Sequence, residues 1–359
     1  MRGMAAICVA LFHCPDFFGK NFLFFDWGWI NVDLFFLISG IVMSHVYERR
    51  IEHGLTTFTE FLSHRIARLW PMHIFAMLTI LVIDIVHYYL FHKHMMDWNA
   101  PLYTFLLNLI LLQNIGLYTS ASLQGHTWDE NAWSLTPEIT ANLVWFYFLA
   151  RKRLSSKLLI TVALIFAVLQ YNLTDSLSGL ILNSNLIRCT ISYALGCLLY
   201  RHFIANAALK SPARPWSDLA ALALSALIVC IILNLALWHS LIFNHWDWIL
   251  VLFVFPAITL CALQHDTVLN RILSSRLFVF LGSISYSVYL LHVQVGMLIR
   301  GVSKHLLKSA PQTPYAGVIY VLLTIGLATL TYKFIEIPAR KALRDRLEPF
   351  LRKFFFDAH

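Results

Sequence analysis

Charged residues are scarce in this sequence. Asp, Glu, Lys and Arg make up 13% of its 359 residues, whereas hydrophobic residues make up 59%. The mean hydropathy is +0.67. A soluble domain of this length needs a much larger charged surface, so the composition excludes a soluble globular protein and indicates a polytopic membrane protein.

Several patterns that carry chemistry in other proteins are also missing. The six cysteines form no C-x-x-C pair, so neither a disulfide framework nor a zinc site is indicated. The 16 histidines show no His-x-x-His or His-Glu-x-x-His spacing, and we predict no metal. The sequence has no Gly-rich phosphate loop and no nucleophile elbow. The first apolar run lacks a small-residue cleavage site, so we expect a retained span.

Apolar runs of membrane-spanning length are abundant. Because about 20 apolar residues cross the bilayer core as a helix, we predict an all-α, polytopic bundle of about ten transmembrane helices. The predicted spans are roughly 3–19, 28–47, 70–91, 132–150, 157–172, 180–200, 217–236, 247–263, 278–299 and 315–336. Polar residues interrupt the shorter run 101–117, where we expect a re-entrant or interfacial helix. Residues 1–337 then form one transmembrane domain.

Lys and Arg residues test this count, because cytoplasmic segments are rich in them. With Arg2 placed in the cytoplasm, 20 of the 27 Lys and Arg residues fall inside and five fall outside. This asymmetry favours a multi-pass protein with both termini in the cytoplasm.

The C-terminal residues 338–359 form a distinct region. Leu343, Leu347 and Leu351 recur at helical spacing among Arg and Lys, and aromatic residues follow. We predict a cytoplasmic, basic amphipathic helix that lies on the inner leaflet and contacts membrane lipids. An ordinary solvated helix is the alternative.

Ionisable residues inside the spans are the strongest functional signal, because a carboxylate in the bilayer is costly unless it is paired. At about 1.5 Å of rise per helical residue, five such residues from five spans come out near one depth. They are His13, Asp33, Asp84, Glu138 and His292. Each alone is compatible with a structural contact between helices, and that is the more frequent role of a single buried histidine. Together they favour an enclosed polar site that opens outward.

A buried histidine beside carboxylates can deprotonate a hydroxyl group when a carboxylate holds the imidazole in the correct tautomer. We therefore predict His13 as a general base that Asp33 or Glu138 orients. At the inner face, Arg65 and Arg68 are three residues apart and share one side of a helix. Paired guanidinium groups there suit phosphates, and lipid headgroups are the alternative ligand.

Six short motifs occur in a recognisable order along the chain. They are Arg2-x₁₀-His13, Phe35-Phe-x-x-Ser39-Gly40, Arg65-x-x-Arg68, Trp133-Ser-Leu-x-x-Glu138, Ser285-Tyr286-Ser-x-Tyr289-Leu-x-His292 and Glu336-x-Pro338. Each is weak alone, but in this order they make the chain resemble the acyltransferase 3 family of integral membrane acyltransferases.

The resemblance implies an O-acetyltransferase of the cell inner membrane. Such an enzyme moves an acyl group, usually acetyl, from cytoplasmic acyl-CoA to a hydroxyl of a surface polysaccharide, another envelope glycan or a lipid-linked sugar. It implies that His13 and Arg2 are essential and that Arg65 and Arg68 lie on the CoA side. We assign acyl-CoA binding to Arg2, Arg65 and Arg68, and substrate contacts to Ser39, Trp133, Tyr286 and His292. No metal or nucleic acid is expected.

Two other functions fit some of the same residues. Polar residues near the membrane midplane are also typical of a transporter or flippase of lipid-linked sugars or polysaccharide. A scaffold without catalysis leaves the five ionisable residues unexplained. The combination of His13 with the paired arginines favours the enzyme, because a flippase requires neither.

The predicted sidedness can be tested with cysteine labels in a cysteine-free background. A cysteine at Ser122 should react with a membrane-impermeant thiol reagent added outside intact cells, because 101–131 faces outward in the predicted topology. A cysteine at Ser155 should react only after the cells are permeabilised. Labelling of position 155 but not position 122 in intact cells would show that the topology is inverted.

Overall fold

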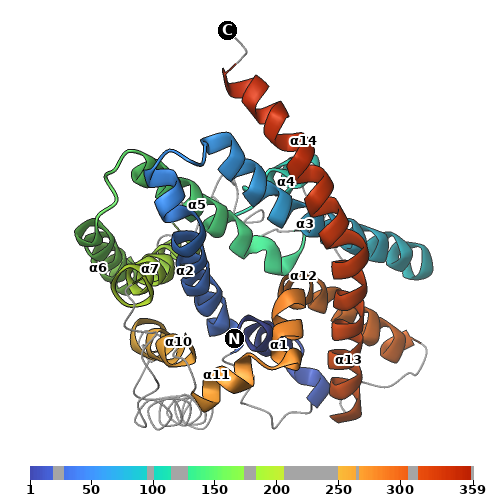
Figure 1. The fold of residues 1–359 in the computed structure, drawn as a ribbon. Helices are drawn as coiled ribbons and strands as arrows, with labels where there is room; N and C mark the ends of the chain where they lie inside the picture. The colour runs from blue at the N-terminus through green and yellow to red at the C-terminus, as the bar shows by residue number, and fades with distance from the viewer. Residues whose placement is uncertain are drawn as a thin grey trace.

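The computed structural model describes residues 1–18, 28–94, 101–114, 128–173, 183–205, 250–263, 267–305 and 314–356. Every regular element among these residues is helical (Figure 1). The all-α prediction is therefore confirmed for this part of the chain.

Four helical stretches are long and apolar enough to cross a membrane: Gly28–Glu52, Phe58–Phe91, Arg276–His305 and Tyr315–Phe355. Three shorter apolar helices cover Arg2–His13, Ser156–Gln170 and Leu250–Leu263. The count of about ten spans thus stays a prediction, and the predicted span 217–236 lies outside the described residues. In the run 101–117, helix α4 (Pro101–Leu109) is nine residues long, and its position relative to the membrane also stays a prediction.

Helices α1 (Arg2–His13), α2 (Asn31–Glu52) and α12 (Arg276–His305) form the centre of the bundle (Figure 1). Small residues let α1 approach α12 closely: a Cβ added at Gly3 would lie 2.6 Å from the main chain of Leu281. Gly40 lets α2 approach α7 (Ser184–Leu199) closely, because a Cβ added at Gly40 would lie 2.2 Å from the carbonyl oxygen of Tyr193 on α7. Close backbone packing through small residues is the usual way in which membrane helices associate.

Helix α3 (Phe58–Phe91) begins twelve residues before the predicted span at 70. Thr57 caps it, because its hydroxyl accepts a hydrogen bond from the backbone N–H of Glu60 at 3.2 Å. Pro71 lies inside this helix. The early start places Arg65 and Arg68 within a continuous helix, where their side chains face the bundle.

The other described elements frame this centre. They are η1 (Pro15–Phe18), η4 (Glu130–Ser134), α5 (Leu135–Ala150), α6 (Ser156–Leu173), η5 (Tyr200–Ile204), η7 (Leu250–Val254), α10 (Phe255–Leu263), α11 (Val268–Leu273), α13 (Pro314–Thr331), η8 (Tyr332–Glu336) and α14 (Ile337–Phe356).

Helices α13 and α14 form one long column, drawn in red-brown and red, which bends at the π-helical turn η8 (Figure 1). Helix α14 packs along α3, and the rings of Phe58 and Phe355 lie 5.9 Å apart. The predicted tail helix is therefore present, whereas its location on the inner leaflet stays a prediction.

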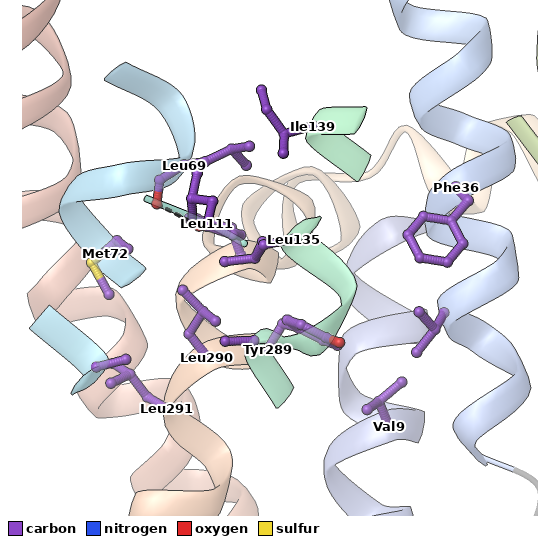
Figure 2. Packing of buried hydrophobic residues seen from close by; sticks show 14 of the residues in the cluster. Val9, Phe36, Leu69, Met72, Leu111, Leu135, Ile139, Tyr289, Leu290 and Leu291 are labelled. Atoms are coloured by element: carbon purple, nitrogen blue, oxygen red, sulfur yellow. Dashed lines mark hydrogen bonds between the residues drawn. The ribbon is translucent and has the colours of Figure 1, made fainter. Parts of the chain in front are cut away.

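The largest apolar core cluster joins five helices of the bundle. Val9, Phe36, Leu69, Leu135 and Tyr289 contribute to it from α1, α2, α3, α5 and α12 respectively, as Figure 2 shows. Close packing of this cluster fixes the five helices relative to one another. Most of the polar side chains described next lie on these same helices, and others lie on η4, η8 and α7.

Candidate functional site

A cavity of about 150 Å³ lies between α1, α2, α3, α5 and α12. Its polar lining consists of Arg2, Ser39, Arg65, Arg68, Ser134, Glu138, Ser285, Tyr286 and Tyr289. Six of the eleven residues that the sequence singled out therefore meet in one place. The other five, His13, Asp33, Asp84, Trp133 and His292, are not in the lining.

Two of the arginines in the cavity have no carboxylate bonded to them among the described residues. Arg65 donates through Nη1 to the sulfur of Met43 at 3.3 Å, and its buried Nε has no partner. Arg2 lies over the ring of Phe35, with Cζ 5.9 Å from the ring centroid. Both side chains are partly exposed, and a guanidinium group without a bonded carboxylate can bind an anion such as a phosphate.

Arg68 is held differently from Arg65. Its Nη1 forms an ion pair with Glu336, and Ser287 donates a hydrogen bond to the other carboxylate oxygen of Glu336 at 2.8 Å. The guanidinium also lies over the ring of Tyr286, 5.1 Å from its centroid. The ion pair and the ring contact thus hold Arg68 in place, so the two arginines have different partners, and their joint binding of phosphate stays a prediction.

Glu138 and Ser39 form a second polar contact on the cavity wall. Ser39 donates from Oγ to Oε1 of Glu138 at 3.0 Å. Glu138 lies in the first turn of α5, where the positive end of the helix dipole stabilises a carboxylate. The guanidinium groups of Arg2, Arg65 and Arg68 thus outnumber the carboxylates of Glu138 and Glu336, so the site has a net positive charge.

His13 and His292 form a pair at the end of α1. Nδ1 of His13 lies 2.9 Å from the carbonyl oxygen of Val9 and 3.2 Å from Nε2 of His292. Nδ1 of His292 lies 3.2 Å from the carbonyl oxygen of Val288. His292 is fully buried, whereas His13 is partly exposed.

One arrangement of protons satisfies all three contacts. His292 donates from Nδ1 to Val288, and His13 donates from Nδ1 to both Val9 and Nε2 of His292. Nε2 of His13 then carries a free lone pair. The pair therefore holds His13 in the tautomer that a general base needs.

The carboxylates expected to orient His13 have other partners. Asp33 forms an ion pair with Arg188 and accepts a hydrogen bond from Ser192 at 3.3 Å. Glu138 is bonded to Ser39, as described above. The structure thus differs from the prediction that Asp33 or Glu138 orients His13, and it puts a neutral imidazole, His292, in that position.

Two further residues selected from the sequence lie apart from the histidine pair. Asp84 accepts from Nδ1 of His94 at 2.7 Å. Trp133 packs against Phe36, with ring centroids 6.4 Å apart. The similar depth estimated for Asp84 along its helix therefore does not bring it into the cavity.

Arg300 fixes the main chain of His13 and was missed in the sequence. It donates to the carbonyl oxygen of His13 at 3.1 Å and to the two carboxylate oxygens of Asp16 at 2.7 and 3.0 Å. In the predicted topology, Arg300 was only one of the five Lys and Arg residues on the outer side of the membrane. Its partner lies 284 residues away, and the spacing of charges in one sequence gives no signal for such a contact.

No group of three or more His, Cys, Asp or Glu residues in the described parts of the chain is placed to hold a metal ion.

Comparison with known proteins identifies a family model and similar sequences. A family model described as an acyltransferase domain matches residues 1–333. Protein 2 in the picA locus of Rhizobium radiobacter is 36% identical over 77 residues, which cover 21% of this chain and 39% of that protein. The peptidoglycan O-acetyltransferase OatA of Listeria monocytogenes is 25% identical over 366 residues, which cover 95% of this chain and 55% of that protein. The chain thus spans about half or less of these curated relatives, and no solved structure matches it significantly.

The contact between Arg300 and His13 can be tested without any substrate. Arg300→Ala should loosen the end of α1, because it removes the donor to the His13 carbonyl and the ion pair with Asp16. Cys14, which is fully buried, should then react with N-ethylmaleimide roughly fivefold faster, the effect of about 1 kcal/mol on local opening.

Mass spectrometry of the Cys14 peptide measures this rate, with buried Cys189 as the internal reference. Arg344→Ala is the matched control, because Arg344 pairs with Asp345 on the exposed face of α14. An unchanged Cys14 rate in Arg300→Ala would contradict the proposed role of this contact.

Proposed function

This chain belongs to the acyltransferase family whose domain model covers residues 1–333, and from that membership we propose that it is a membrane-bound O-acetyltransferase. The proposed donor is cytoplasmic acetyl-CoA, and the acceptor is a hydroxyl group of a glycan of the cell envelope. The proposed location is the inner membrane with both termini in the cytoplasm. The similarity to a peptidoglycan O-acetyltransferase over 95% of the chain supports a glycan acceptor.

The observation that carries the proposal is the cavity with Arg2 and Arg65, whose guanidinium groups have no bonded carboxylate among the described residues. Acyl-CoA brings phosphate groups that such arginines bind well. A cavity of about 150 Å³ has room for roughly five water molecules, so it encloses only a small part of a CoA molecule. The residues present therefore fit an anionic group of the donor, or its acyl end held beside these charges.

His13 is the proposed general base, acting through Nε2. It takes the proton of the acceptor hydroxyl while the acceptor oxygen forms a bond to the acyl carbon and the carbon–sulfur bond of the thioester breaks. The proton then passes from Nε2 of His13 to the leaving thiolate. No further reactant is needed, and the products are an O-acyl ester and free CoA.

The remaining residues have supporting parts in this proposal. His292 keeps the proton of His13 on Nδ1, which leaves Nε2 free to accept. Arg68, fixed by Glu336, presents a rigid guanidinium to the cavity. Ser39, Glu138 and Tyr286 contact the donor from the cavity wall. Trp133 supports the wall from behind through Phe36.

Reconstitution in proteoliposomes tests the proposal. Acetyl-CoA supplied only on the face that bears the C-terminus should support acetylation of a glycan supplied only on the other face. His13→Ala should lower kcat at least ~10²-fold, because a general base typically contributes that much. His45→Ala is the matched control, since His45 is an exposed histidine on α2.

Mass spectrometry of the glycan measures the transfer. Near wild-type kcat in folded His13→Ala would contradict the catalytic assignment. Movement of a lipid-linked sugar across the bilayer by the wild-type protein, with no acetyl transfer, would replace the enzyme by the flippase.

A further inference from the structure

The arginine-lined cavity and the histidine pair are separate features of the structure. His13 and His292 do not line the cavity, although Tyr289, one turn before His292 on α12, does. If the chain is an acyltransferase, the acyl group of a donor bound at Arg2 and Arg65 has to reach Nε2 of His13. The residues between the cavity and His13 therefore determine which acyl groups can reach His13.

A chain of ring contacts connects the cavity to His13. The ring of Phe35 lies under Arg2, 5.9 Å from Cζ, and packs edge-to-face on Tyr289 with a centroid separation of 5.7 Å. The ring of Tyr289 is 6.3 Å from that of His292, which contacts His13 at 3.2 Å. Phe35 and Tyr289 thus lie between Arg2 and the histidine pair.

Tyr289 is held in place by hydrogen bonds. Its hydroxyl donates to the carbonyl oxygen of Asn131 at 2.9 Å and lies 2.8 Å from Oγ of Ser134. Both partners belong to the turn η4 and are buried. Moving the Tyr289 ring would break these bonds in a buried place, which is costly.

Among the described residues, Phe35 contacts the guanidinium of Arg2, the ring of Tyr289 and apolar side chains. It is partly buried, and it packs against three of the apolar core clusters at once, where α1, α2 and α12 meet. Its neighbour Phe36 is buried deeper in the core and packs on Trp133. Of the two rings between Arg2 and the histidine pair, Phe35 is the one that can turn without losing a hydrogen bond.

We propose that Phe35 sets the length of the acyl group that this protein transfers. The inference rests on the proposed acyltransferase function. A two-carbon acetyl group needs only a small displacement of the Phe35 ring. A longer chain has to displace the ring into close-packed clusters, and overpacking of that kind is destabilising.

The acyl-length preference of variants tests this role. Phe35→Ala should raise the ratio of kcat/KM for butyryl-CoA to that for acetyl-CoA by at least about tenfold, since one methylene group in an apolar pocket changes discrimination by about tenfold or more. Phe35→Leu should give a smaller rise in the same direction. Phe75→Ala is the matched control, because Phe75 is a partly buried Phe of α3 that packs against the same core and does not line the cavity.

Different results would contradict the role of Phe35 and the acyltransferase function. Acetyl transfer by the wild type, with the same length ratio in Phe35→Ala, Phe75→Ala and wild type, would overturn the role of Phe35 and leave the acyltransferase standing. A wild-type protein that transfers neither acyl group would overturn both. If Phe35→Ala does not fold, Phe35→Leu gives the same comparison, and an unchanged ratio in that variant would count against the inference.

Discussion

Charge pairing inside the helical bundle is the constraint on which this structure depends. A charged side chain between membrane helices is expensive unless an opposite charge or several hydrogen bonds satisfy it. Arg68 meets this requirement through Glu336, and Asp33 meets it through Arg188. Against these pairs, Arg2 and Arg65 stand out, because no carboxylate is bonded to either among the described residues.

The packing of α1 on α12 brings His13 and His292 into contact. Gly3 permits close approach near the start of both helices, and Arg300 ties α12 to the carbonyl of His13 at the other end. Between these two points, His292 meets His13 side chain to side chain. As the proposed general base, His13 then needs no carboxylate beside it. Its tautomer is set by an imidazole that is itself fixed by the carbonyl of Val288.

Much of this could be predicted from the sequence, and the missing part has a physical reason. Hydropathy predicted the all-α fold class. The rise per helical residue predicted that His13 and His292 lie at a similar depth in the membrane, and in the structure their side chains are in contact. The same estimate failed for Asp84, because depth along a helix does not say which way a side chain points. The partners of Arg68 and Arg300 lie 268 and 284 residues away. Such pairings depend on how the helices pack, and a single sequence does not encode them locally.

Under the proposed function, Arg65, which has no bonded carboxylate among the described residues, binds the anionic acyl donor. Isothermal titration calorimetry of the purified protein with CoA, at fixed salt concentration, tests it most directly. We expect Arg65→Met, which keeps the apolar stem and removes the charge, to weaken CoA binding at least about tenfold, because it removes a charge-assisted hydrogen bond worth about 1.5–3 kcal/mol. Arg153→Met, at an exposed position after α5, should bind as the wild type does. Equal CoA affinity in all three proteins would contradict the account.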